Sequence, residues 1–499
     1  MASVPLFDRA FAPAGWLVAA LSDQARRERT VIAVLVAYVA IWTLYGVLAK
    51  GSQDVHADMA EVVAWSRDLA WGYSKHPPLS AWVTAGWFAL FPLTDASFYL
   101  LAMTMAGLAL WIAWHLAGDY LDAERRVLAL VILMLVPFFN FHALKFNANT
   151  VLMPLWAATT LCFLRSYERR SAGWAVLAGL FAAGAMLGKY WSVFLLMGLG
   201  IAALLDARRA GYFRSSAPWI TIAVGAVAMA PHLVWLVGSD FAPIKYASVV
   251  HAAETGVKLT AVQYLTGSVA SVVLAVVLAL AVIRPNLAAV RDILWPKAPE
   301  RRLAAAAFWW PFLLPVLAPL LADFSITPLW SMSAWTLLPV VVLSSPLVAL
   351  HRDAMWATVA IAVALPPVMV AAAPAIANSI HRDQGGSATV HSRLLAERIG
   401  FEWRRVTDKP LRTVTGDSGL AEGAAFYLPS RPRTESGTDR ERLLRDGFVI
   451  VCYTSPECLA RASKQGVQGS PIDVEITRSY RGVAGRVGHY AIVVAPPRP

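Results

Sequence analysis

The sequence predicts a polytopic all-α membrane protein followed by a small α/β domain. The chain of 499 residues is 58% hydrophobic and only 15% charged, whereas soluble domains average about 25% charged residues. Its apolar residues form blocks long enough to cross a bilayer, which takes about 20 residues. Beyond residue 375 the chain is polar and rich in Arg, Gly and Ser. A purely soluble fold is therefore excluded.

Eleven transmembrane helices account for the apolar blocks. On one side of this arrangement the loops carry 18 Lys and Arg residues, and on the other side they carry 7. Because positive charge marks cytoplasmic loops, the first set and the N-terminus are cytoplasmic. This topology explains the net charge of +11 without a nucleic-acid partner. The spans are expected near 31–49, 95–117, 127–139, 148–166, 174–188, 190–206, 217–237, 262–283, 304–322, 331–350 and 355–373.

The N-terminal segment is not expected to be a cleaved signal peptide. Residues 1–30 lack the basic start, the continuous apolar centre and the small-residue cleavage site of such a peptide. The apolar stretch from Phe11 to Leu21 instead predicts a helix that lies in the membrane interface before the first span.

The expected domain boundary follows residue 375. Residues 1–375 form the transmembrane domain, and 376–499 form an extracytoplasmic soluble α/β domain, because eleven spans that start inside end outside. The runs FVIVCY (448–453) and HYAIVVA (489–495) are typical of strands, and ERLLRDG predicts a helix that ends at Gly447. Cys452 and Cys458 either pair in an oxidising compartment or point apart.

The outer loops collect the polar residues that are candidates for chemistry. The first loop, 50–78, carries several acids together with Lys75, His76 and Pro77-Pro78. A second outer loop reads NFHALKFNAN (140–149), and the fourth spans 238–261. Polar groups gathered on one face of a membrane protein are candidates for function, whereas topology alone explains the Arg-rich inner loops. We therefore expect the active face to be the outer one.

Several of these residues also have a purely structural interpretation. Asp58 and Glu61 are three apart and share a helix face, which is typical of a solvated edge. The Pro-Pro pair typically ends one helix and starts the next. Lys189 is harder to explain in this way, because it lies in the tight turn LGKYW between two apolar spans. A lysine there needs an anionic partner, and a lipid phosphate would supply one.

A metal site is an open alternative at this point. Asp54, His56, Asp58 and His76 offer the oxygen and imidazole ligands that hard and borderline cations accept. Their spacing matches no established ligand pattern. The sequence therefore predicts no cofactor, with a divalent metal kept as the alternative.

The first outer loop carries a motif that resembles a known family. The stretch DMAEVVAWSRDLAWGYSKHPPLSAW is similar to the first outer loop of bacterial protein-O-mannosyltransferase and aminoarabinose-transferase enzymes, which have the C-type glycosyltransferase fold. That family shows an acidic pair opening a helix, then W-G-Y, then x-P-P-L. Three later segments resemble the family's segments in the same order: FNANTVLMPLWA, GAMLGKYWSVFLL and APHLVWLVGSDFAPIKYA. The resemblance covers roughly residues 30–350.

The resemblance implies a transferase that takes a sugar from a polyprenyl-phosphate carrier on the outer face of the inner membrane. Asp58 matches the first acid of the pair, which acts as a base or orients the acceptor. Met59 occupies the place of the second acid, so either Glu61, one turn further on, substitutes for it or no second carboxylate is needed. A second departure is Asn149, which stands where the family has aspartate, and both departures favour a metal-independent mechanism. The donor phosphate would contact Lys189, His76, Lys75 and Lys145, and the substrates would contact Asn149, Tyr73, His142, Lys245 and Tyr246.

The expected partners are a polyprenyl-phosphate-linked sugar and a lipid A, glycolipid or protein acceptor in the cell envelope, with membrane lipids around the chain. Two alternatives remain open. A transporter or flippase of lipid-linked substrates would place charges at mid-membrane and show internal repeats, and neither is evident. A catalytically inactive scaffold is the other alternative, because of the departures at Met59 and Asn149.

Overall fold

The computed structural model describes residues 12–252, 257–322, 324–384, 386–434, 440–453, 460 and 470–498. The chain forms two compact units. Unit 1 comprises Met1–Thr43, Ala70–Ser80 and Leu100–Val368, and unit 2 comprises Leu44–Leu69, Ala81–Tyr99 and Met369–Pro499. The division falls inside the helices α3 (Arg27–Ala49), α5 (Leu79–Leu90), α6 (Asp95–Ala117) and α19 (Arg352–Arg382). Each unit is described by itself below.

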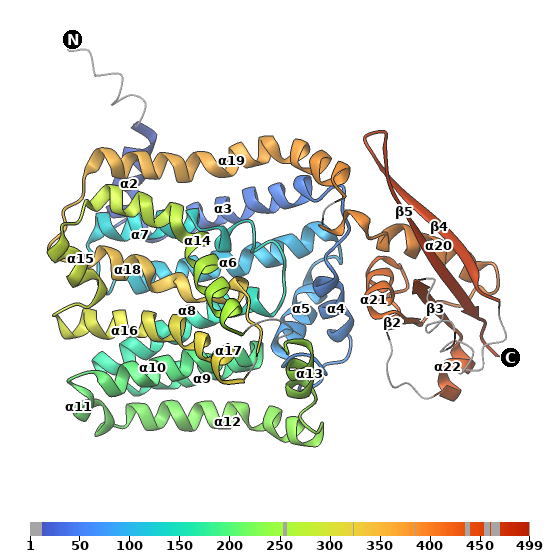
Figure 1. Ribbon diagram of the computed structural model, residues 1–499, viewed down its shortest axis with the longest axis horizontal. Helices are drawn as coiled ribbons and strands as arrows, with labels where there is room; N and C mark the ends of the chain where they lie inside the picture. The colour runs from blue at the N-terminus through green and yellow to red at the C-terminus, as the bar shows by residue number, and fades with distance from the viewer. Residues whose placement is uncertain are drawn as a thin grey trace, which may run out of the picture. The chain divides into compact units, whose positions relative to one another are not determined.

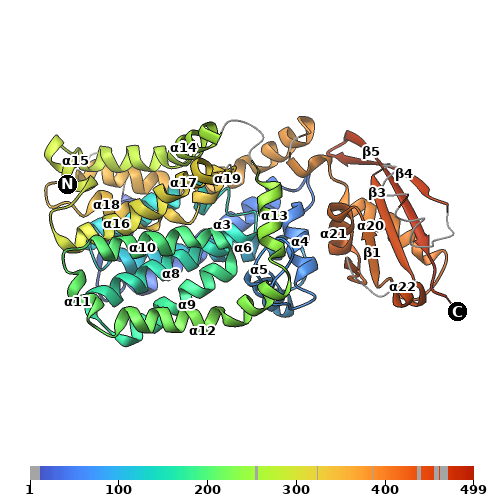
Figure 2. The same cartoon turned by 60° about the horizontal axis from the view of Figure 1, so that its bottom comes forward.

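Among the described residues of unit 1, the regular secondary structure is helical apart from one short bridge between Ala252 and Phe324. Its long helices pack side by side: α9 contacts both α8 and α12, and α10 contacts α16 (Figures 1 and 2). Besides α3, α6 and α19 its helices are α2 (Ala12–Ser22), α7 (Ala123–Leu135), α8 (Ala148–Arg169), α9 (Ala172–Gly188), α10 (Val193–Leu205), α11 (Arg209–Phe213), α12 (Ala217–Gly238), α13 (Ala242–Val250), α14 (Val257–Ile283), α15 (Leu287–Leu294), α16 (Pro299–Leu313), α17 (Leu317–Ala322) and α18 (Leu338–Leu343).

Six segments among the described residues are long and apolar enough to cross a membrane: Arg27–Ala49, Asp95–Ala117, Ala217–Gly238, Leu259–Ile283, Pro299–Leu321 and Arg352–Arg382. The chain is therefore a multi-pass membrane protein, as expected. Every predicted span contains helix, but the one at 331–350 is broken into the 3-10 turns η4 (Pro328–Ser331) and η5 (Ala334–Leu337) and the short α18. Prolines begin η4 and occupy the first turn of α18, and a proline cannot donate a backbone hydrogen bond to the preceding turn. The number of eleven spans stays a prediction.

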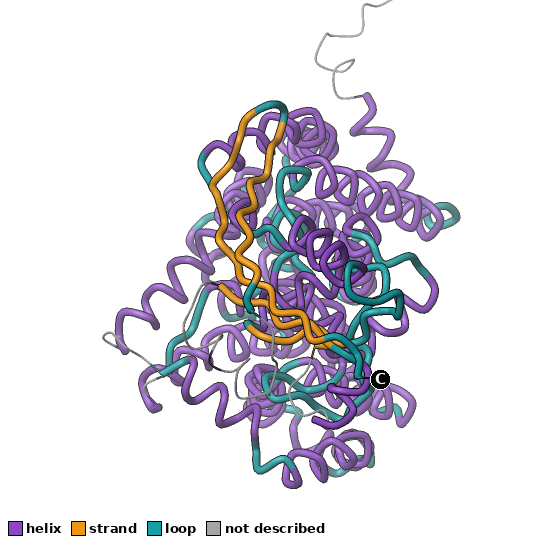
Figure 3. The backbone as a smooth tube through the Cα atoms, turned by 90° about the vertical axis from the view of Figure 1, so that its right-hand side faces the viewer, coloured by secondary structure: helices purple, strands orange, loops and turns teal. Residues whose placement is uncertain are grey.

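Unit 2 contains a five-stranded sheet in the order β2-β1-β3-β5-β4. β1 is parallel to both β2 and β3, whereas β3 and β4 are antiparallel to β5, and the long β4–β5 ribbon is visible in Figure 3. The strands are β1 (Thr413–Gly416), β2 (Arg433–Thr434), β3 (Phe448–Tyr453), β4 (Ile472–Tyr480) and β5 (Val483–Ala495), and the helical elements are α4 (Ala57–Trp65), α5 (Leu79–Leu90), η6 (Gly386–Thr389), α20 (Ser392–Arg404), α21 (Ser418–Tyr427) and α22 (Arg440–Asp446).

The strand and helix predictions for the tail are confirmed. FVIVCY is β3, HYAIVVA lies within β5, and α22 ends one residue before Gly447, whose φ of 72° is the left-handed conformation that favours glycine. Cys452 is disulfide-bonded. Cys458, its partner in one of the two alternatives, lies outside the described residues.

The sheet of unit 2 is covered by helices on both faces. Buried side chains of α20 and α21 pack against one face, where Val414, Val451 and Ile492 point. Partly buried leucines of α22 pack against the other face, over Phe448 and Ile450. The first-loop helix α4 also belongs to this unit and packs against α21.

Candidate active site

In unit 1, the Trp-Gly-Tyr segment of the first loop is fixed against α12. A Cβ at Gly72 would lie 2.2 Å from the Trp235 ring, so only glycine fits there. The carbonyl of Trp71 lies 2.6 Å from Nδ1 of the buried His232. Because a carbonyl only accepts, Nδ1 donates, and in a neutral ring Nε2 then accepts from the Tyr190 hydroxyl at 2.9 Å. The motif is thus connected to the turn that contains Lys189.

Lys189 lies directly after the last residue of α9, in extended conformation. Its Nζ donates to Oδ1 of Asn149 at 2.8 Å and lies 4.3 Å from the centroid of the Trp330 ring. Asn149 is held in the first turn of α8, where its backbone N–H donates to the capping side chain of Asn147. The structure therefore brings Lys189, which is predicted to contact the donor phosphate, together with Asn149, which is predicted to contact the substrates, and it adds Trp330.

His251 lies beside this lysine. Its ring meets the Trp330 ring edge to face, with centroids 4.9 Å apart. Burial lowers the pKa of His251, and the charges of Lys189 and Lys75 lower it further, so both ammonium groups lie within electrostatic range of the imidazole. Lys75 lies 6.0 Å from the centroid of the Tyr246 ring. We call Lys75, Asn149, Lys189, Tyr246, His251 and Trp330 the Lys189 cluster.

The other residues of unit 1 that are predicted to contact the donor or the substrates lie in or beside the first, second and fourth outer loops of the sequence prediction. The backbone N–H of Tyr73 donates to the carbonyl of His76 at 3.0 Å, and the carbonyl of Lys145 accepts from the Thr150 hydroxyl at 2.7 Å. His142 is exposed beside Phe138. Lys245 is exposed and pairs with Asp240. The substrate contacts of Tyr73, His76, His142, Lys145 and Lys245 stay predictions.

In unit 2, Asp58 and Glu61 lie on α4, as the sequence predicts. The helix begins after His56, whose Nδ1 accepts the backbone N–H of Asp58 at 3.1 Å. Met59, Ala60, Val62 and Val63 are buried on the side that packs into the unit. The side chain of Asp58 is 33% exposed, and Glu61 is partly exposed as well. Both acids thus remain accessible to solutes.

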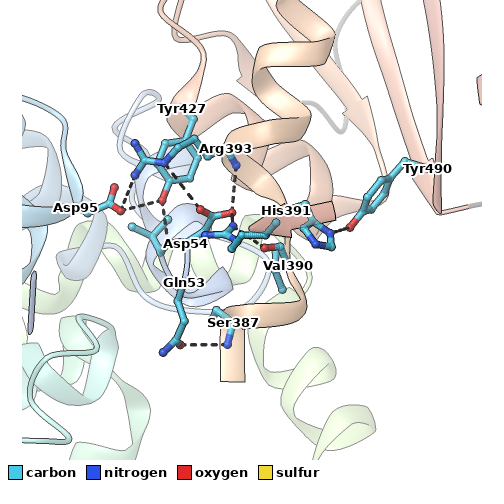
Figure 4. Close-up of polar contacts among 11 residues, drawn as sticks. Gln53, Asp54, Asp95, Ser387, Val390, His391, Arg393, Tyr427 and Tyr490 are labelled. Carbon is cyan, nitrogen blue, oxygen red and sulfur yellow. Dashed lines mark hydrogen bonds and ion pairs between the residues drawn. The ribbon is translucent and has the colours of Figure 1, made fainter. Parts of the chain in front are cut away.

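The alternative metal site would need Asp54, whose carboxylate has other partners. It is fully buried and pairs with Arg478 and Arg393 (Figure 4). Within the described part of the chain, no three His, Cys, Asp or Glu side chains are grouped so that they could hold a metal ion. Two arginines therefore neutralise the acid that the sequence offered as a metal ligand.

An apolar cavity of about 340 Å³ lies among α8, α9, α10 and α12. Its lining includes Met186, three residues before Lys189, and Met229, three residues before His232. Because a helix rises about 1.5 Å per residue, the cavity ends about one turn from the Lys189 cluster. At its far end are Tyr212, Phe213 and Pro218.

Comparisons with known proteins identify glycosyltransferases that are similar to this chain. Residues 75–235 match the family described as dolichyl-phosphate-mannose-protein mannosyltransferase. Two proteins of Rhizobium johnstonii are similar to part of the chain: the lipid A galacturonosyltransferase RgtD, 27% identical over 209 residues, and the lipopolysaccharide core galacturonosyltransferase RgtB, 29% identical over 230 residues. The matched segments cover 41% and 44% of this chain, and 44% and 45% of those proteins, so the match spans less than half of either relative's length.

The solved structure of ArnT from Cupriavidus metallidurans in the apo state has the same fold. It superposes with a TM-score of 0.63 over 98% of this chain and 100% of ArnT, at 13% identity. The resemblance inferred from the first-loop motif is thereby confirmed. Over part of its length the chain is thus similar to bacterial membrane glycosyltransferases, and its fold is that of ArnT.

Proposed function

We propose that the protein is a glycosyltransferase that moves a sugar from a polyprenyl-phosphate carrier to lipid A or a related envelope glycolipid. The reaction would take place on the periplasmic face of the inner membrane, with the N-terminus in the cytoplasm and the C-terminal domain in the periplasm. The observation that carries the proposal is the Lys189 cluster, in which Lys189 lies at the end of an apolar helix, held by Asn149 and Trp330, in a chain with the ArnT fold. The names of the two relatives favour a uronic acid as the sugar.

The chemistry that this cluster supports is stabilisation of a phosphate leaving group. Transfer breaks the bond between the anomeric carbon and the phosphate oxygen, and the electron pair remains on that oxygen. The phosphate therefore gains one negative charge as the acceptor oxygen bonds to the sugar. Lys189 and Lys75 would stabilise that charge, and fixed positive charge in a site that excludes water often contributes more to catalysis than any other single effect. Asn149 and Trp330 hold the Lys189 ammonium group in place.

Asp58 would act on the acceptor. If the acceptor is a sugar hydroxyl, the carboxylate accepts its proton, which typically contributes about 10² to 10⁴ in rate. With a phosphate acceptor, Asp58 would only orient it. Glu61, one turn along the same helix face, would support either role. This mechanism needs no metal, and we expect EDTA to leave the transfer rate unchanged.

The apolar cavity beneath the cluster suits the hydrocarbon chain of the carrier. Its lining is made largely of Ala, Gly, Leu, Met and Phe side chains with few polar atoms, as expected for a site that binds a lipid chain. A carrier phosphate at Lys189 would place the first part of its chain at Met186 and Met229.

The test compares lipid A and core glycolipids by mass spectrometry in cells that produce the wild-type protein, Asp58→Asn, or the control Glu475→Gln. Glu475 is an exposed acid on β4. A uronic acid present with the wild type and the control, and absent with Asp58→Asn, would support the proposal. If secreted proteins lose the sugar instead, the acceptor is a protein. If no pool differs while the wild-type protein is in the membrane, the glycolipid proposal is wrong and the scaffold alternative returns.

A further inference from the structure

Within unit 2, the C-terminal segment holds the first-loop residues that precede α4 through a buried ion-pair network. The Asp54 carboxylate has no exposed surface, and the Arg478 side chain beside it is only 12% exposed. The same carboxylate accepts the backbone N–H of Arg393 at 3.2 Å. Arg478 also donates to the carbonyl of Val390 at 2.9 Å. Two arginines and one backbone amide of the C-terminal segment thus converge on a single first-loop acid (Figure 4).

A second set of contacts surrounds the first. The Tyr427 hydroxyl accepts the backbone N–H of Val55 at 2.9 Å and donates to Asp95 at 3.1 Å. Burial, followed by the charges of Asp95 and Asp54, raises the pKa of Tyr427, so the hydroxyl keeps the proton that it donates. Arg393 pairs with Asp95 at 2.9 Å and lies over the Tyr427 ring, 4.4 Å from its centroid.

The residues that follow α4 are held as well. The Arg67 guanidinium donates to the carbonyl of Pro432 and, at 3.2 Å, to the carbonyl of Ala425. Asp68 pairs with Arg433 at 3.1 Å. The helix that carries Asp58 and Glu61 is therefore fastened by the C-terminal segment at both of its ends.

We propose that Asp54, Arg393 and Arg478 are positioning residues that fix α4, and with it the Asp58 carboxylate, in the orientation that transfer requires. A buried ion pair is a weak source of net stability, because desolvation offsets most of its attraction, and a role in fixing one arrangement is its better-attested use. The first loop reaches Arg478 across 424 residues of sequence, so the contact defines a tertiary arrangement rather than a local turn. The inference rests on the proposed function for the role of Asp58, but the fastening of α4 does not depend on it.

The experiment compares Arg478→Gln with the wild type, with the conservative Arg478→Lys and with Glu475→Gln, an exposed position on the same strand. Hydrogen exchange is followed in the full-length protein for peptides covering 52–68 and for β3 (448–453), and transfer is measured as kcat and donor KM. We expect faster exchange in 52–68 and unchanged exchange in β3. We also expect kcat about 100-fold lower, since a misplacement of about 1 Å costs that much, with donor KM within about twofold. Arg478→Lys should recover part of both effects.

Asp54→Asn, which keeps the shape of the side chain but removes its charge, is the second variant and should act in the same direction. Unchanged exchange in 52–68 would overturn the inference, whatever happens to kcat. Equal acceleration in β3 and 52–68 would also overturn it, because the arginine would then stabilise the whole unit. Selective acceleration in 52–68 in a protein whose wild type transfers no sugar would support the fastening of α4 and refute the proposed function.

Discussion

Replacing Lys189 by methionine is the sharpest test of the proposed leaving-group chemistry. Methionine keeps an unbranched side chain but loses the charge, the 2.8 Å hydrogen bond to Asn149 and the contact with Trp330. An ammonium group at about 4 Å from the leaving phosphate stabilises one added negative charge by about 4 kcal/mol at an effective dielectric constant of about 20. Since about 1.4 kcal/mol is a factor of ten in rate, the upper limit is about 10³ in kcat. Because Lys189 is half-buried, screening reduces this, and we expect a loss of about 10² to 10³.

The assay uses purified full-length protein with a radiolabelled polyprenyl-phosphate sugar and a glycolipid acceptor. Lys189→Arg, which keeps the charge, should retain more activity than Lys189→Met. Lys297→Met removes an exposed lysine of the same unit and should change neither kcat nor KM. A Lys189→Met protein with wild-type thermal stability and kcat within about threefold of wild type would refute the assignment.

Three further predictions concern other residues. Gly72→Ala places a Cβ against the rigid Trp235 ring, so the free energy of unfolding should fall by an amount typical of overpacking, about 1–3 kcal/mol. Gly86→Ala, with open space around it, should not lower the unfolding midpoint. Trp330→Leu removes a cation–π contact worth about 1 kcal/mol and should raise donor KM about fivefold, whereas Trp330→Phe should have a smaller effect, as steady-state kinetics would reveal. His391 has a pKa lowered by burial and by a neighbouring arginine, so its neutral form favours folding. The stability of unit 2 should therefore fall as pH drops below about 6.5, and a melting-temperature series from pH 8 to 5 should be flatter for His391→Phe.

The helices of unit 1 and the strands β3 and β5 could be predicted because each depends on the pattern of neighbouring residues in the sequence. Apolar blocks of bilayer length predict the helices, β-branched runs predict β3 and β5, and a glycine after a charged turn marks the end of α22. The position of Lys189 in a tight turn could also be predicted, because it is a single charged residue between two long apolar segments of the sequence. α20, α21 and β1 were not predicted, although the spacing of the apolar residues Leu395, Ile399 and Trp403 is a helical signal that could have revealed α20. β1 is only four residues long, too short for a clear alternating pattern.

The partners of the site residues were not predictable. Trp330 and His251 look like ordinary interface residues in the sequence, and only folding brings them to Lys189. The sequence suggests Asp54 as a metal ligand, but the structure shows it paired with Arg478, which is 424 residues away. Such long-range polar pairs leave no periodicity and no spacing that a single sequence reveals.

The distance in sequence between Asp54 and Arg478 has a consequence for biosynthesis. During translation at about 5–20 residues per second, the arginine emerges about 20–85 s after the acid that it neutralises. Until Arg393 and then Arg478 have emerged, Asp54 lacks the two arginines with which it pairs in the folded unit. The contacts that hold the helix carrying Asp58 can therefore be completed only after nearly the whole polypeptide has been synthesised, and a nascent or truncated chain that ends before Arg478 would lack this one.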